Sequence, residues 1–259
     1  LRLWPTVNDY SDLTSEALFL NKIKNIQYVR KPGCTYKPYE IVFLSYHEPY
    51  AENAYKRLQA RFNVTWIKDI EGRFTAHQQA ANTVTSSMFW VVDADAEVAD
   101  DFDFSYMPDV YDQDVVHVWN SVNPITGQEY GYGGVKLFNT QQVREATSWG
   151  LDFTTGLSSR FKAMPQISNT TRFNTDEFST WRSAFRECVK LTANADEESR
   201  TRLSGWLNPV KDARFRDQAL AGAKDGISYA KEFANKPLKM AKINDYEWLE
   251  DYYNEQYKS

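Results

Sequence analysis

The sequence predicts an α/β fold in which strands alternate with helices. Three short apolar segments, residues 41–44, 64–67 and 89–92, have the length and composition of buried strands. The two segments between them, residues 52–62 and 75–83, are predicted helices, and the first carries its apolar residues on one face. A strand–helix–strand–helix–strand order within about 55 residues is typical of a parallel sheet with right-handed crossovers.

The pattern changes after this unit. Residues 114–119 and 135–138 are further predicted strands, and the segment 120–134 between them, rich in Gly, Asn and Pro, is a predicted loop. Residues 140–148 are a predicted helix, and residues 180–192 form a strong one because their large apolar side chains recur on one face.

Three parts are expected along the chain. Residues 1–39 form an N-terminal extension with a short helix over residues 15–23. Residues 40–192 form the α/β domain that carries the functional site. Residues 193–259 are charged and mostly helical, so they are predicted to be a helical C-terminal appendage.

Composition limits the class of protein. Hydrophobic residues make up 42% and charged residues 25% of the 259 residues, so the chain is expected to bury a sizeable core. A net charge of −5 gives no overall basic footprint for non-specific binding to nucleic acid. No apolar run approaches the roughly 18 residues that span a membrane. Cys34 and Cys188 lie far apart, without metal-binding spacing, and predict a cytoplasmic protein with reduced thiols.

The most informative motif is a pair of carboxylates that follows the third predicted strand. Asp93 and Asp95 are separated by one residue at the end of the apolar run that begins at Met88. Side chains alternate between the two faces of a strand, so both carboxylates are predicted to point the same way. Oxygen ligands of this kind suit Mn2+ or Mg2+, and such an ion keeps positions open for substrate phosphates. The motif therefore predicts a metal–diphosphate site.

Polar residues also follow the first two strands. Ser45, Tyr46, His47 and Glu48 follow the first strand, and Asp69 follows the second. Ligands of open parallel sheets bind at the carboxyl ends of the strands. Polar clusters at three successive strand ends therefore indicate one shared binding edge.

This order of motifs resembles that of the GT-A glycosyltransferases, most closely their family-2 members. The resemblance covers about residues 41–190, and it implies a GT-A-like (Rossmann-type) mixed sheet flanked by helices. By this resemblance, Ser45, Tyr46, Glu48 and Asp69 hold the nucleoside of a sugar nucleotide. Asp93 and Asp95 would hold a divalent metal that bridges the diphosphate of the donor.

The resemblance also implies the remaining site residues. Asp176, with Glu177 as second choice, occupies the place of the general base that takes the proton of the acceptor hydroxyl. Gly133 and Gly134 belong to a glycine-rich turn that lies beside the donor sugar in that family. His117, in a predicted strand, is a third candidate metal ligand or donor contact, with a core histidine as the alternative interpretation.

The predicted function is metal-dependent transfer of a sugar from a nucleoside-diphosphate donor, by family habit a UDP-sugar, to an acceptor hydroxyl. Segments 119–120, 131–135 and 181–191 also resemble glycosyltransferase-like proteins of tailed phages. That resemblance implies a modified base in phage DNA as acceptor and the host cytoplasm as location, with a glycan or a protein as other acceptors.

Two alternatives stay open. One is a non-catalytic module that binds a sugar or a partner protein. The other is a nucleotidyltransferase, which needs a glycine-rich phosphate loop with a basic residue after the first strand. Residues 45–52 contain neither glycine nor Lys or Arg, so this alternative ranks lower.

Overall fold

The computed structural model describes residues 38–147, 157, 160–194 and 196–258. The predicted helix over residues 15–23 and Cys34 lie outside these residues, as does the end of the helix predicted over residues 140–148.

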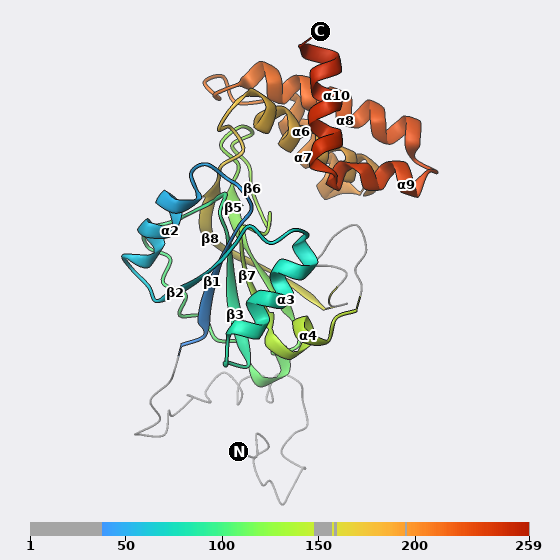
Figure 1. Ribbon diagram of the computed structural model, residues 1–259. Coiled ribbons are helices and arrows are strands. Elements are labelled where there is room, and N and C mark those ends of the chain that lie inside the picture. Colours follow the sequence, from blue (N-terminus) through green and yellow to red (C-terminus); the bar gives the residue numbers. More distant parts are fainter. Residues whose placement is uncertain (1–37, 148–156, 158–159, 195, 259) are drawn as a thin grey trace, which may run out of the picture. The chain divides into compact units, whose positions relative to one another are not determined.

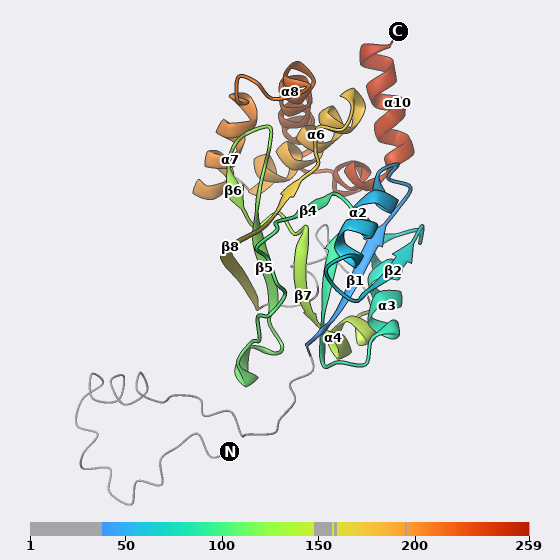
Figure 2. The same ribbon diagram turned by 90° about the vertical axis from the view of Figure 1, so that its left-hand side faces the viewer.

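The described residues contain one mixed sheet of eight strands. The strands are β1 (Glu40–Ser45), β2 (Val64–Lys68), β3 (Met88–Asp93), β4 (Ala96–Val98), β5 (Val116–Val122), β6 (Glu129–Tyr130), β7 (Val135–Asn139) and β8 (Phe161–Thr171). They are ordered β2-β1-β3-β7-β5-β8-β4, and β6 pairs with β5 outside this path. Figure 2 shows β2 and β8 toward opposite sides of the sheet.

Strand directions divide the sheet into two regions. β1 pairs in parallel with both β2 and β3, which confirms the parallel unit predicted from the sequence. β7 runs antiparallel to β3 and to β5, whereas β5 and β8 are parallel to each other. The predicted mixed sheet flanked by helices is thus confirmed.

Helices cover both faces of the sheet. α2 (Ala51–Gln59) packs on one face, against apolar side chains of β1 and β3. α3 (Arg73–Thr83) and α4 (Thr140–Glu145) pack on the other face. These helices lie on opposite sides of the sheet in Figure 1. Helices therefore cover both faces of the strand β3. This explains why its residues from Met88 to Val92 are all apolar and have no exposed surface.

The strand predictions were right in the first half of the sheet and incomplete in the second. The strand predicted over residues 114–119 is β5, which begins at Val116 and extends to Val122, into the predicted loop. β4, β6 and β8 were not predicted. β8 is largely exposed over its first half and contains Pro165, so it lacks the apolar run that marks a buried strand.

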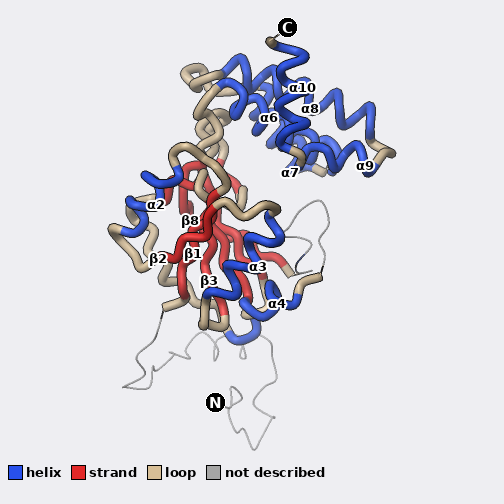
Figure 3. Tube along the Cα trace, in the orientation of Figure 1, coloured by secondary structure: helices blue, strands red, loops and turns tan. Residues whose placement is uncertain are grey.

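The C-terminal part is helical, as predicted. It contains α6 (Glu177–Asn194), α7 (Glu197–Leu207), α8 (Arg216–Phe233), α9 (Pro237–Met240) and α10 (Tyr246–Tyr257); two 3-10 turns, η2 (Val110–Asp112) and η3 (Ala241–Asn244), complete the described elements. Figure 3 shows these helices together at the C-terminal end of the chain. The expected boundary at residue 192 falls inside α6, whose apolar side chains pack with those of α8 and α10. No helix among the described residues is long and apolar enough to cross a membrane.

Candidate functional site

The carboxyl ends of β1, β2 and β3 bring the predicted residues to one edge of the sheet. Ser45 is paired with Lys68, and Leu44 with Asp93, so the three strands end at the same level. The backbone N–H of Asp69 donates to the carbonyl of Ser45 at 2.9 Å. The polar residues after the three strands therefore share one edge, here called the carboxyl edge.

The loops of this edge contain two left-handed residues that are not glycine. His47 has a φ of 61° and Asp69 a φ of 54°. The Asp69 carboxylate accepts a hydrogen bond from the backbone N–H of His47 at 2.9 Å, so the two strained residues hold each other in place. Strain of this kind costs about 1–3 kcal/mol per residue and is concentrated at functional sites.

The residues after β1 divide into structural and exposed ones. Ser45 is buried, and its hydroxyl accepts a hydrogen bond from the indole of Trp66 at 2.9 Å, so it fixes β1 to β2. Tyr46 is 43% exposed, and its ring lies 4.6 Å from that of His47. Glu48 accepts a hydrogen bond from the backbone N–H of Tyr46 at 2.6 Å. Burial and the charge of Asp93 raise the pKa of Glu48.

Asp93 ends β3 and makes an ion pair that the sequence analysis did not foresee. Its Oδ2 lies 2.8 Å from the Nζ of Lys136, a residue of the neighbouring strand β7. The lysine side chain is 8% exposed and that of the aspartate is 34% exposed. The backbone N–H of Asp93 donates to the carbonyl of Gly134 at 2.9 Å, which ties the glycine-rich turn to the end of β3.

Asp95 lies near Asp93 for a different reason from the one predicted. β3 ends at Asp93, and Asp95 lies in the turn into β4, so alternation along a strand does not determine its direction. Its Oδ1 is buried and has no hydrogen-bond partner among the described residues. Burial, together with the charges of Asp93 and Glu48, raises the pKa of Asp95 to about 7.

The glycine-rich turn lies against both the carboxylates and β8. Gly133 has a φ of 98°, which only glycine adopts without strain. A side chain at Gly134 would place its Cβ 2.9 Å from the amide nitrogen of Asn169 and 3.0 Å from the Cβ of Ala96. Close packing of the turn therefore accounts for Gly134 without a ligand.

The predicted base residues begin α6. Asp176 accepts hydrogen bonds from the backbone N–H and the hydroxyl of Ser179, both at 2.7 Å, and from the hydroxyl of Thr175 at 3.1 Å. It therefore caps the helix. Partial burial opposes ionisation, but the hydrogen bonds from Ser179 outweigh it and lower the pKa of Asp176. Glu177 is exposed in the first turn.

Arg182 of α6 connects the two sets of acids and was not singled out from the sequence. Its positive charge acts on Glu48, Asp95 and Asp176. The guanidinium lies over the ring of Tyr246, 4.4 Å from the centroid. In the sequence, Arg182 lies on a predicted helix with an apolar face, and no motif there indicates its proximity to the carboxyl edge.

The prediction of His117 as a metal ligand is not supported by its position. His117 lies within β5, paired with Leu137, which in turn pairs with Trp90, three residues before Asp93. Its ring is fully buried, 5.3 Å from that of Tyr106. Burial lowers the pKa of His117. The core interpretation of this histidine is therefore the better one.

The arrangement does not fit the predicted divalent ion. No group of three or more His, Cys, Asp or Glu side chains in the described part of the chain is arranged to hold a metal. Of the three predicted ligands, His117 lies elsewhere and Asp93 is already paired with the ammonium of Lys136. Asp95 is then the remaining candidate, and a single carboxylate holds Mn2+ or Mg2+ only where waters and the phosphates of a ligand supply the other oxygen ligands.

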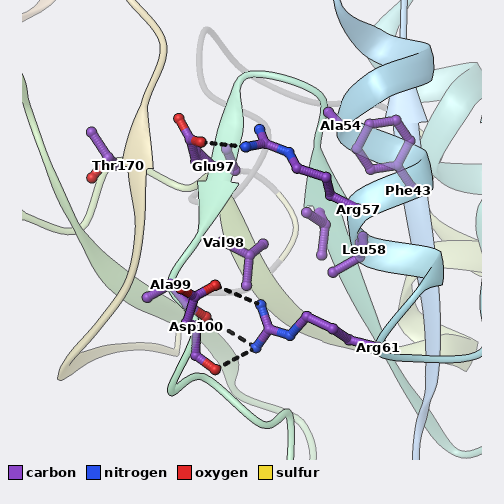
Figure 4. Close-up of a pocket in the computed structure, with 12 residues that line it drawn as sticks. Phe43, Ala54, Arg57, Leu58, Arg61, Glu97, Val98, Ala99, Asp100 and Thr170 are labelled. Atoms are coloured by element: carbon purple, nitrogen blue, oxygen red, sulfur yellow. Dashed lines mark hydrogen bonds and ion pairs between the residues drawn. The ribbon is translucent and has the colours of Figure 1, made fainter.

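A cavity of about 340 Å³ lies outside the carboxyl edge, between α2 and β4 (Figure 4). The two arginines that line it, Arg57 and Arg61, already interact with acceptors of the protein. Arg57 pairs with Glu97 at 2.6 Å, and Arg61 donates to the carbonyls of Ala99, Asp100 and Phe102 at 2.8–3.1 Å. These contacts fasten α2 and the residues just after it to the segment after Asp95. None of the predicted site residues lines the cavity.

No family model matches the sequence, and no curated protein matches it. Among solved structures, the mannosyltransferase PcManGT from Pyrobaculum calidifontis, in complex with GDP-Man and Mn2+, aligns over 88% of this chain and 85% of its own. It has 12% identity and a TM-score of 0.42. HddC from Yersinia pseudotuberculosis, complexed with GMP-PN, aligns over 52% of this chain and 91% of its own, with 14% identity and a TM-score of 0.35. These are distant likenesses in fold, so the case for a function rests on the residues of this chain.

Proposed function

We propose that this protein transfers a sugar from a nucleoside-diphosphate donor to an acceptor hydroxyl. The observation that carries the proposal is the Asp93–Lys136 pair at the carboxyl edge of three parallel strands, next to a glycine-rich turn. Open α/β sheets bind ligands at this edge. A cation there, beside backbone without side chains, suits the phosphates of a sugar nucleotide.

The residues after β1 and β2 suit the nucleoside. Tyr46 and His47 present neighbouring rings at the edge, on which a base can stack. Glu48 and Asp69 are carboxylates in the same loops and can accept hydrogen bonds from ribose hydroxyls. UDP is the proposed nucleotide, as the sequence resemblance implies.

The reaction breaks the bond between the anomeric carbon of the sugar and the diphosphate oxygen. Negative charge grows on the leaving diphosphate, so a fixed cation at the edge stabilises the transition state. The acceptor hydroxyl attacks the anomeric carbon and gives its proton to a base, for which Asp176 remains the proposed residue and Glu177 the second choice. Arg182 lies within electrostatic range of Asp176 and Asp95, and it can neutralise part of the negative charge that grows on the leaving diphosphate.

The proposal specifies the acceptor only as a hydroxyl group, which can belong to a glycan, a protein or a modified DNA base. A net charge of −5 gives DNA no general attraction to the chain. A DNA acceptor would therefore need a local basic surface.

One observation favours a second candidate, a non-catalytic module that binds sugar nucleotides or a partner protein. The oxygens of Asp176 are engaged in capping α6, and a carboxylate held in this way is a weak base. Binding without turnover would leave the carboxyl edge in use but make Asp176 dispensable.

A thermal-shift panel of nucleoside diphosphates and sugar nucleotides, with and without Mn2+, tests the proposal. A ligand that binds only the folded state raises the melting temperature. We expect one base to give a clear shift. The Tyr46→Ala variant, which lacks the proposed stacking ring, should lose most of it, while Tyr111→Ala, a change at another exposed tyrosine, keeps it. No shift with any nucleotide would contradict a donor site in this chain.

Detection of free nucleoside diphosphate after incubation with the matching sugar nucleotide then separates the two candidates. Release of the diphosphate, with water or an added acceptor, supports an enzyme. Binding without release supports the module.

A further inference from the structure

We propose that Lys136 is the cation that binds the donor diphosphate, and that nucleotide binding therefore needs no divalent metal. This inference rests on the proposed donor site. It concerns the ion pair of Asp93 with Lys136, which the metal-binding interpretation of Asp93 and Asp95 did not include.

Lys136 is built into the site. Its backbone lies in β7, between β3 and β5, and its side chain is only 8% exposed. The Nζ reaches Asp93 Oδ2 at 2.8 Å. A Cβ at Gly133 would lie 3.9 Å from this Nζ, so the backbone of the turn passes beside the ammonium. The charge is thus fixed at the carboxyl edge and does not swing in from the surface.

The charges around Lys136 call for a cation at this place. The carboxylates of Asp93, Asp95 and Glu48 lie near one another, and like charges at short range repel. The positive charge of Lys136 acts in the opposite direction on Asp95. The lysine thereby performs within the protein the neutralisation that a bound metal would otherwise provide.

A lysine and a divalent ion compete for this position. An ion bound to the same oxygen of Asp93, at about 2.1 Å, would lie no farther than about 5 Å from the ammonium. Two positive groups at that distance repel each other strongly in a partly buried site. The buried stem of Lys136 restricts its retreat, so the structure favours the lysine over the ion.

The ammonium also has capacity for a ligand. It carries three N–H donors, and among the described residues Asp93 Oδ2 accepts one of them. Lysine binds phosphate as a compact point charge, which suits a diphosphate whose charge is shared by several oxygens. Asp93, at 34% exposure of its side chain, lies at the boundary with solvent from which the donor would approach.

The experiment is calorimetric titration of the nucleoside diphosphate that gives the largest thermal shift. Wild type is titrated in EDTA and in Mn2+, and Lys136→Met and Lys162→Met are titrated in EDTA. Lys162 is the matched control, because it is a strand lysine paired with an aspartate, Asp112, but is 47% exposed. We expect wild type to bind within about threefold in the two buffers, Lys136→Met to bind on the order of ten- to a hundredfold more weakly, and Lys162→Met to bind like wild type.

The outcomes separate this inference from the proposed function. Wild-type binding that appears only with Mn2+ would overturn the role of Lys136 and leave the donor site intact. Unchanged binding by a folded Lys136→Met would do the same. Absence of binding by wild type in both buffers would overturn the donor site and this inference together. The wild-type comparison decides between metal and lysine even where Lys136→Met fails to fold.

Discussion

The interface between α6 and α8 and the carboxyl edge of the sheet are built on opposite principles. In the interface, Gly222 and Gly226 let the two helices touch: a Cβ on Gly222 would overlap the carbonyl oxygen of Trp181, and one on Gly226 that of Phe185. Both of those aromatic residues are fully buried and belong to one cluster of apolar side chains. Every local feature of this interface favours a single tight packing.

The carboxyl edge contains features that reduce stability. His47 and Asp69 have left-handed backbones, and Asp95 has a buried oxygen without a partner in the described part of the chain. Asp93, Asp95 and Glu48 repel one another. Folding alone gives no reason for such a cluster, whereas a ligand that brings phosphates and hydrogen-bond donors does. Substitutions in the interface should therefore destabilise the protein, whereas removing charge at the edge should stabilise it.

The largest effect is expected at the interface. Gly222→Ala places a methyl group against the backbone of Trp181, where a side-chain rotation cannot relieve the overlap. We expect a loss of about 3 kcal/mol or more in the free energy of unfolding. Urea denaturation followed by tryptophan fluorescence measures it, with Lys224→Ala, an exposed change on the same helix, as control. A loss below about 0.5 kcal/mol would contradict the close packing of α6 and α8.

The next effect is a gain in stability, and it is expected at the carboxyl edge. The pKa of Asp95 is raised to about 7 from an ordinary value of 3.8. The folded protein therefore binds this proton more tightly than the unfolded chain does, and the resulting stabilisation is fully present below about pH 4 and lost as the pH rises to about 7. Asp95→Asn carries no such charge, so we expect it to be more stable than wild type at pH 8 by on the order of 2 kcal/mol.

Thermal melts of the Asp95→Asn variant and wild type between pH 4 and 8 test this prediction. Asp101→Asn, an exposed change a few residues away, is the control and should follow wild type. If the curves of Asp95→Asn and wild type run parallel over this range, the carboxylate cluster does not cost stability and the comparison between the two regions fails.

The smallest effect on stability is expected at the start of α6, where the two roles of Asp176 separate. Asp176→Ala removes the cap and should cost about 1 kcal/mol, whereas Asp176→Asn keeps an oxygen for the N–H of Ser179 and should cost almost nothing. If Asp176 is the base, Asp176→Asn lowers the rate of sugar transfer by about 100-fold or more, with melting unchanged. A fully active Asp176→Asn would assign the residue to helix capping alone.

The first half of the fold could be predicted because its strands are short runs rich in apolar residues. The segments of β1, β2 and β3 are short apolar runs bounded by polar residues, and polar side chains follow each of them. Chain order places such residues at one edge of a parallel sheet, so the carboxyl edge follows from sequence alone. β8 could not be found in this way, because its exposed half and Pro165 read as loop.

Site residues could be predicted only where their position follows from the local sequence, and not where it depends on contacts with distant parts of the chain. Residues 135–138 predict an apolar strand, and a charged residue among apolar neighbours is the signal that Lys136 gives of its role. Its partner Asp93 is 43 residues away in the chain. The same limit applies to Arg182, because its electrostatic influence on Glu48 and Asp95 depends on tertiary packing. It also applies to His117: the strand that contains it was predicted correctly, but its distance from Asp93 is set by the register between strands.

The most direct test of the account is a crystal structure of the protein with the nucleoside diphosphate selected by the thermal-shift panel, grown in EDTA. We expect phosphate oxygens within hydrogen-bond distance of Lys136 Nζ, beside Gly133, and the base near Tyr46. A nucleotide bound elsewhere, such as in the cavity between α2 and β4, would contradict it.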